Sequence, residues 1–267
     1  MESLDKIKPL SHSIGAIFSA FGIISLLLSY YLTSQVMAFI GLGLSFWGAL
    51  FFLITPTEYV EGNLLVNTLS AAYSTTERII KDLNYKGKAI HIPPYPEGPY
   101  IPEHLKELKE LVAYIPKEAQ TNQPPSLDAL AQHRFLLQNP KGILLTPPGL
   151  GLLTAIEHKT KTDFTKLSSD EAYKALSTGV LNSFSLAKEI RMTNKQDEII
   201  VHIKQSLYGK LYSNDNFEHS INLLGCPIVS CIACALTKSS AKPICIEKIA
   251  IAPDGKTINA HYKIIEA

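Results

Sequence analysis

Two uncharged apolar segments stand close together near the N-terminus. Ile14 to Leu32 and Val36 to Ile54 contain no charged residue, and each is 19 residues long. A helix of that length crosses the roughly 30 Å hydrocarbon core of a bilayer. Only the three residues Thr33 to Gln35 separate the segments. They therefore predict a tight hairpin of two membrane-spanning helices. A cleaved signal peptide is disfavoured, because Tyr30 to Leu32 closes the first segment where a small-residue cleavage site would stand.

The charges around this hairpin predict its orientation. Lys6 and Lys8 precede the first segment, and the turn between the segments carries no positive charge. The positive-inside rule then places both ends of the hairpin on the cytosolic side. We expect a multi-pass protein of the cell membrane with both termini and the soluble part in the cytoplasm. Because neither segment contains an Asp, Glu, Lys or Arg, a transport path through them is disfavoured.

Small residues recur at four-residue spacing in both segments. Ala16 and Ala20 do so in the first, and Gly41, Ser45 and Ala49 in the second. Such ridges let helix backbones approach closely inside a bilayer. Two interpretations stay open: packing within the hairpin, and formation of a homo-oligomer through it.

The rest of the chain predicts a soluble α+β domain. We expect a transmembrane hairpin over residues 1–57 and a cytosolic domain over 58–267, with an internal loop over 116–140. The net charge of +1 and the presence of only three arginines disfavour a nucleic-acid partner. Apolar periodicity and turn residues then predict individual elements. Helices are expected at Gly62–Asn84, from the end of the turn Pro147–Gly151 to about His158, and at Ser168–Ile190; strands are expected at Lys88–Ile92, Leu111–Ile115, Ile143–Thr146 and Glu198–Tyr208.

Two local patterns sharpen this prediction. Ser168 and Glu171 have the spacing of a capping box at a helix start. The turn Pro147 to Gly151 follows a strand and precedes a helix, which is the outline of a phosphate-binding loop. It lacks both the third glycine of a dinucleotide site and a Gly-Lys-Ser/Thr sequence. Its glycines instead predict a tight turn and close helix packing.

The C-terminal segment predicts a buried helix followed by a β-hairpin. Leu224 to Lys238 is small and apolar on every side, which is typical of a helix surrounded by protein. Two strands are expected after it, Pro243–Ile251 and Thr257–Ile265, joined by the turn Pro253 to Lys256.

The cysteines near the C-terminus allow three interpretations. They are small apolar core residues, or Cys231 and Cys234 contribute to a metal site, or Cys226 is a reactive thiol at a helix N-terminus. In the third case His219 or His261 would act as base, and redox use of the pair Cys231 and Cys234 belongs to the same class. A second close pair of ligands is missing, so we predict no metal and no cofactor.

Three stretches of the sequence resemble a known group of proteins. They read GILLTPPGLGLLTAIE, SLYGKLYS and LGCPIVSCIACALTKSSAKPICIEKIAIAPDGKTI. This pattern resembles uncharacterised archaeal membrane proteins that carry two N-terminal spans followed by one soluble α+β domain. That group has no assigned activity, so the resemblance implies a fold and supplies no functional residues.

The segment Leu224 to Ile264 is also similar to the 4-vinyl reductase domain. That domain occurs in small-molecule sensors and is related in fold to vesicle-tethering subunits. The cysteine that this family often carries in its last strand is absent here, where the strand reads Asn259 to Tyr262. The resemblance therefore implies a ligand-binding fold without implying metal or tetrapyrrole binding.

These observations together predict a membrane-anchored protein whose cytosolic domain acts as a small-molecule-binding or protein-interaction module. A small apolar ligand is expected in a pocket between the Ser168–Ile190 helix and the cysteine-containing helix. The expected partners are the lipid bilayer and a second copy through the hairpin. The alternative is a thiol-dependent enzyme or redox protein that uses Cys226 or the pair Cys231 and Cys234.

Overall fold

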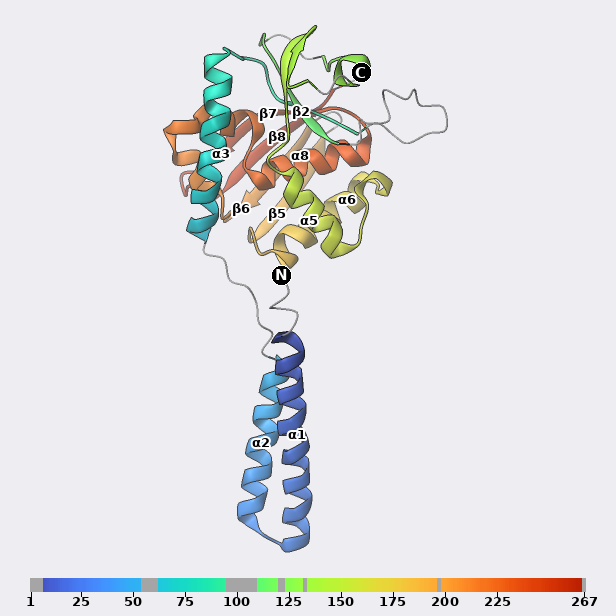
Figure 1. The fold of residues 1–267 in the computed structure, drawn as a ribbon, viewed down its shortest axis with the longest axis vertical. Coiled ribbons are helices and arrows are strands. Elements are labelled where there is room, and N and C mark those ends of the chain that lie inside the picture. Colours follow the sequence, from blue (N-terminus) through green and yellow to red (C-terminus); the bar gives the residue numbers. More distant parts are fainter. Residues whose placement is uncertain are drawn as a thin grey trace. The chain divides into compact units, whose positions relative to one another are not determined.

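The computed structural model describes residues 7–53, 62–94, 110–119, 123–131, 134–195 and 198–265 (Figure 1). Two compact units follow each other along the chain, Met1–Val60 and Glu61–Ala267. The last residue of the second expected span, Ile54, lies outside the described residues, as do residues 120–122 and 132–133 of the expected loop over 116–140.

The first unit is a hairpin of two helices, α1 (Ile7–Leu32) and α2 (Gln35–Leu53). Thr33, in the turn between them, has a left-handed backbone with φ of 47°. Both helices are long and apolar enough to span a membrane, so the expected hairpin is confirmed and marks a membrane protein.

Small residues bring the two helices of the hairpin into close contact. Added Cβ atoms show how close: at Gly22 the atom would lie 2.3 Å from Ser45 Oγ, and at Gly48 it would lie 2.3 Å from Ser19 Oγ. A Cβ at Gly41 would lie 2.9 Å from the backbone of α1. Glycine is needed at these three positions because any side chain there would push the helices apart.

The interface uses different small residues of α1 from those expected. Ala16 and Ala20 are exposed, as is Ala49 of α2, whereas Gly15 and Gly22 are buried. The close-packing ridge of α1 is displaced by one residue because Gly15, Ser19 and Gly22 follow one helix face at steps of four and three. The sequence pattern therefore correctly predicts close packing through small residues. It identifies the residues involved only in α2, where they are Gly41 and Ser45.

A third segment, Asp215–Ser240, is also apolar enough for a membrane span, yet it belongs to the core of the second unit. Of its most apolar window, 89% is buried inside the protein. It is also two helices, α7 (Glu218–Leu224) and α8 (Pro227–Ser240), with Gly225 between them at φ of 74°. We therefore treat only α1 and α2 as membrane-spanning.

The second unit is an α+β domain built on an antiparallel sheet, as expected. Among the described residues, eight strands form this sheet in the order β3-β4-β2-β1-β7-β8-β6-β5. Alternation places Ile199, Val201 and Ile203 on the buried face of β6, in agreement with the sequence pattern. The strands are β1 (Ile90–Ile92), β2 (Val112–Pro116), β3 (Leu136–Gln138), β4 (Lys141–Leu145), β5 (Glu189–Lys195), β6 (Glu198–Lys204), β7 (Ile244–Ile251) and β8 (Ile258–Ile264).

Helix α8 is buried on all sides and organises this domain. It contacts β1 and β7 of the sheet on one side and α5, α6 and η2 on the other (Figure 1). Tyr262 on β8 donates its hydroxyl proton to the carbonyl of Val229 on α8 over 2.9 Å. The other helical elements are α3 (Gly62–Asp82), α4 (Leu127–Ala131), α5 (Leu150–Thr160), η2 (Phe164–Lys166), α6 (Ser169–Ser177), η3 (Thr178–Ser183), η4 (Gly209–Ser213) and η5 (Asp215–Phe217).

Two tyrosines hold the corner between α7 and α8. The Tyr73 hydroxyl donates to the carbonyl of Gly225 over 2.7 Å, and the amide of Cys226 donates to the Tyr212 hydroxyl over 2.9 Å. Both backbone groups lie where helical hydrogen bonding is interrupted, so the tyrosines satisfy polar groups that would otherwise be costly to bury.

The glycine turn before α5 packs directly on α8. A Cβ at Gly149 would lie 2.0 Å from the amide nitrogen of Cys231. Only glycine fits such an approach of two backbones. The expectation of close helix packing is thus confirmed at Gly149.

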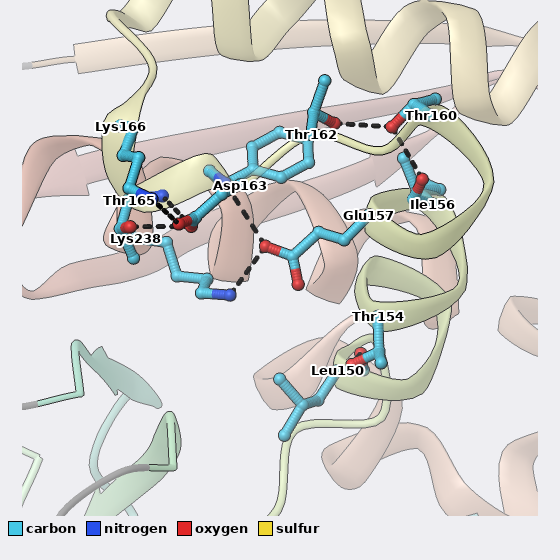
Figure 2. Close-up of polar contacts among 11 residues, drawn as sticks. Leu150, Thr154, Ile156, Glu157, Thr160, Thr162, Asp163, Thr165, Lys166 and Lys238 are labelled. Atoms are coloured by element: carbon cyan, nitrogen blue, oxygen red, sulfur yellow. Dashed lines mark hydrogen bonds and ion pairs between the residues drawn. The ribbon is translucent and has the colours of Figure 1, made fainter.

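An ion pair completes the contact between α5 and α8 (Figure 2). Lys238 donates to Glu157 over 2.7 Å, and each side chain is only 19% exposed. The same Glu157 oxygen accepts from the amide of Phe164 over 3.3 Å. One carboxylate therefore joins α5, α8 and η2.

The expected helix over Ser168–Ile190 is wrong in its second half. The capping box is present, since Glu171 accepts from both the amide and the hydroxyl of Ser168. However, α6 ends at Ser177, a π-helical turn (η3) follows, and Ile190 belongs to β5, where it pairs with Ile203. The helical period continues past Ser177 by chance, and pairing with β6 overrides it. The stretch 116–140, expected as a loop, likewise contains α4 and β3.

His91 is the most unusual polar residue of the core. It lies on β1 between Ala113 of β2 and Ile244 of β7 and is fully buried. Neither of its ring nitrogens has a hydrogen-bond partner among the described residues. Burial lowers the pKa of His91 to about 4, from 6.5 for an exposed histidine.

We predict that His91 makes the domain sensitive to mild acid. As the pH falls from about 6.5 to about 4, the unfolded chain binds a proton that the folded one rejects, so stability falls by up to about 1.4 kcal/mol per pH unit. Above pH 6.5 this effect is absent. Urea unfolding of the full-length protein in detergent, followed by circular dichroism, measures it.

In that experiment His91→Leu should reduce the dependence of the free energy of unfolding on pH between pH 6.5 and 4. His158→Gln changes an exposed histidine and should leave the slope as in the unmodified protein. Equal slopes for the unmodified protein and His91→Leu would contradict the prediction.

Candidate functional site

The four cysteines are free thiols inside the protein. Cys226, Cys231 and Cys234 are fully buried, and Cys245 is 3% exposed. Burial raises the pKa of all four thiols, that of Cys245 to about 12. At neutral pH they are protonated, which matches the interpretation as small apolar core residues.

The sheet separates the cysteines that a metal site would need. Cys231 and Cys234 lie on α8, on the sheet face where Tyr262 contacts that helix. Cys245 pairs with Lys263, whose side chain points to the opposite face because residues alternate along a strand. Within the described ranges, no three His, Cys, Asp or Glu side chains come together as a metal site.

The two histidines considered as bases for Cys226 are engaged elsewhere. His261 pairs with Ile200 and Lys248 on the sheet face opposite α8. His219 uses its Nδ1 to contact Glu77 over 2.8 Å, and its side chain is 59% exposed, whereas Cys226 has no exposed surface. None of the four cysteines, which all lie in described segments, presents the exposed thiolate that a thiol-dependent enzyme uses.

We predict that the four thiols resist alkylation in the folded protein. Iodoacetamide at neutral pH should leave all four unmodified within the time in which a free cysteine reacts completely, because both burial and the raised pKa suppress the thiolate. Mass spectrometry of intact protein counts the adducts. Full modification in urea is the control, and rapid modification of Cys226 alone under native conditions would contradict the prediction.

A buried carboxylate joins α3 to α7. Glu77 is 3% exposed and accepts from the amide of Ser220 over 2.7 Å, from Nδ1 of His219, and from Lys81 at 3.0 Å. Burial alone would raise the pKa of Glu77, but the Ser220 amide, Lys81 and His219 lower it to about 2. Glu77 thus supplies an N-terminal cap to α7 from another helix.

A groove of about 350 Å³ lies beside this cap. Its lining mixes both charges with apolar surface, and it contains no hydroxyl or thiol nucleophile apart from the phenol of Tyr85. The lining residues are Tyr85, Lys86, Glu218, His219, Asn222 and Leu223. The geometry assigns Glu77 and His219 a structural role here.

We predict that Glu77→Gln lowers the stability of the domain at neutral pH by about 3 kcal/mol. The folded pKa lies below the unfolded value of 4.5, so this contribution is complete above pH 4.5 and is lost as the pH falls toward 2. Chemical unfolding at several pH values measures the difference. Glu218→Gln changes an exposed carboxylate at the start of α7 and should have little effect, and a Glu77→Gln deficit that persists unchanged at pH 2 would contradict the assignment.

The larger pocket of the domain, about 730 Å³, we call the basic pocket. This volume lies within the range of roughly 300–1,000 Å³ typical of ligand sites. Four separate segments meet there: the start of α3, the loop from η3 to β5, the loop from β6 to η4, and the turn between β7 and β8. Its lining residues are Gly62, Asn63, Leu181, Asn182, Ser185, Ala187, Lys188, Gln205, Ser206, Leu207, Lys210 and Lys256.

Backbone contacts hold these segments together. The amide of Ser206 donates to the carbonyl of Lys256 over 2.9 Å, and the amide of Leu207 donates to that of Leu186 over 3.0 Å. A Cβ at Gly209 would lie 2.3 Å from the carbonyl oxygen of Gly255. Glycine at 209 therefore lets the β6–η4 loop rest on the β7–β8 turn, and the pocket walls are fixed by main chain.

Two wall residues have an uncommon backbone. Ser185 and Gln205 adopt left-handed conformations, with φ of 52° and 51°. Such conformations in residues other than glycine cost about 1–3 kcal/mol and concentrate at functional sites. They turn both loops sharply at the pocket edge.

The charge lining the basic pocket is entirely positive among the described residues. Lys188, Lys210 and Lys256 line it, and none of them forms an ion pair with a described carboxylate. Glu189, beside Lys188 in the sequence, pairs with Lys204 and Arg191 instead. The sequence did not predict this cluster, because the three lysines stand in three separate segments, two loops and η4, and share no motif.

The region between α6 and α8, where an apolar pocket is expected from the sequence, is closely packed. Helices α6 and α8 pack directly on each other, and Ala172, Leu176 and Val180 are buried in the same core as Cys231 and Cys234. The space expected to hold an apolar ligand is therefore filled with side chains. The basic pocket opens at the other end of that segment, from Leu181 to Lys188, and adds lysines and neutral polar side chains to a largely apolar lining.

Comparison with known proteins places the chain in one group. A domain of unknown function, DUF7982, matches residues 11–260, which include both hydrophobic helices and the α+β domain. No curated protein and no solved structure matches the chain.

Proposed function

The chain belongs to the DUF7982 family of unknown function, and from its own geometry we propose that it is a membrane-anchored ligand-binding domain. The ligand is a small molecule that binds in the basic pocket. The carrying observation is that four distant chain segments converge on one ligand-sized pocket whose walls include two left-handed residues. The resemblance of the C-terminal segment to small-molecule sensor domains supports the same proposal.

Unused hydrogen-bonding groups at the pocket support ligand binding. The side chains of Asn182, Ser185 and Gln205 form no hydrogen bond with any residue that the structure describes. All three line the same pocket, so their polar groups are available to a molecule that binds there. Lys210 is held by Asn63, to which its ammonium group donates over 2.8 Å, and it keeps two further donors.

Native mass spectrometry of the full-length protein, extracted from its own host in detergent, tests this proposal. We expect a non-covalent mass excess that Asn182→Trp removes, since an indole at this exposed lining position fills the pocket without touching the core. Asn222→Trp places the same side chain in the smaller groove and should retain the ligand. Retention of the mass excess by Asn182→Trp, or its absence from the unmodified protein, would refute binding in the basic pocket.

We also propose that both ends of the hairpin, and with them the α+β domain, lie on the cytoplasmic side. Lys6 and Lys8 beside the first span support this orientation, as do thiols that remain free and buried.

Membrane-impermeant maleimide distinguishes the two orientations, because the natural cysteines are buried. Ser34→Cys in the hairpin turn should be labelled in intact cells, whereas Lys242→Cys in an exposed loop should be labelled only after permeabilisation. The opposite pattern would reverse the proposed topology.

A further inference from the structure

We infer that the ligand of the basic pocket carries a phosphate group, either on a lipid headgroup or on a soluble molecule. This inference rests on the proposed function, since it names the chemical class of the ligand in the same pocket. Two observations support it: the three lysines of the pocket form no ion pair with a described residue, and the nearby carboxylates are bound to other groups.

Three ammonium groups around one pocket repel one another unless an anion is present. Lys188 and Lys256 come from two different loops and Lys210 comes from η4, so their convergence is a product of the tertiary fold. None of them forms an ion pair within the described residues, whereas Lys81, Lys88, Lys204 and Lys238 of the same domain all do. The basic pocket therefore gathers three unpaired positive charges in one place, with no carboxylate among its described lining residues.

The nearest carboxylates are committed to other partners. Asp254 stands two residues from Lys256, but its oxygens accept from the amides of Lys256 and Thr257 and from the Thr257 hydroxyl. Those bonds hold the Asp254 carboxylate within the β7–β8 turn. Glu189 is held by Lys204 and Arg191 on β5 and β6. An anionic ligand would thus meet three ammonium groups without displacing an internal ion pair.

The donor set fits phosphate better than a carboxylate. A phosphate monoester carries a charge of about −1.5 to −2 and three acceptor oxygens, whereas a carboxylate carries one charge and two oxygens. Three lysines with neutral donors from Asn182, Ser185 and Gln205 match the larger charge and the greater number of acceptors.

The phosphate group could belong to either of two kinds of molecule, a lipid or a soluble phosphate ester. Gly62, which lines the pocket, follows α2 after only eight residues of sequence, so the domain is tethered to a bilayer whose anionic lipids carry phosphate. A soluble phosphate ester offers the same group. The experiment below separates these sources.

The test uses full-length protein in nanodiscs and follows the acylation rate of each lysine by mass spectrometry. One arm adds inorganic pyrophosphate to phosphatidylcholine nanodiscs, and the other uses nanodiscs that contain phosphatidylglycerol. We expect at least one arm to slow acylation of Lys188 and Lys256 about tenfold while exposed Lys159 and Lys242 are unaffected. Protection only by pyrophosphate assigns a soluble ligand, and protection only by phosphatidylglycerol assigns a lipid headgroup.

A charge-matched pair of variants checks specificity. Lys188→Glu with Lys256→Glu should abolish protection of Lys210, whereas Lys159→Glu with Lys242→Glu has the same net charge and should preserve it. Equal loss in both double variants, or no protection in either arm, overturns the inference. If the native ligand is then still lost from Asn182→Trp, the proposed function stands and only the phosphate assignment fails.

Discussion

The complete burial of α8 is the constraint on which the α+β domain depends. A helix that is apolar on every side must be surrounded, and here the sheet lies on one side and α5, α6 and η2 on the other. The approach is close enough to require Gly149, and the ends of the helix are held by polar contacts from elsewhere in the chain. Tyr73 and Tyr212 bind the corner before α8, and Glu157 binds Lys238 near its end. The cysteines of α8 are buried because of this position, which explains why their pattern resembles a metal motif without forming a site.

The same hydrophobicity has two outcomes in this chain, and packing distinguishes them. Segments α1 and α2 expose most of their apolar side chains, and only a narrow row of glycines and serines is enclosed between them. The segment Asp215–Ser240 has a comparable mean hydropathy but is almost wholly enclosed by protein. A lipid environment suits the first pair because no other described element of that unit covers their apolar surface. The apolar surface of the third segment is instead covered by the sheet and the neighbouring helices.

Several features of the fold follow from the sequence alone because they depend on local patterns. The α+β class, the hairpin, the capping box at Ser168 and Glu171, and the alternation along β6 each depend on residues close in sequence. Predictions failed where distant contacts prevailed. The helical period beyond Ser177 gives way to pairing between β5 and β6, and β5 is too polar to show alternation. The close-packing face of α1 is chosen by its contacts with α2, which shifts it from Ala16 and Ala20 to Gly15, Ser19 and Gly22.

The candidate site belongs entirely to the tertiary structure. Lys188, Lys210 and Lys256 are ordinary surface lysines in the sequence, and only the closure of the sheet, with Gly209 resting on the β7–β8 turn, brings them around one pocket. The sequence by itself determined that the chain has a membrane hairpin and one α+β domain with a buried cysteine-containing helix, because hydrophobic length and periodicity are properties of contiguous residues. The tertiary structure decided which thiols and histidines are isolated from one another and where charge accumulates, because those properties depend on distances between residues far apart in the chain.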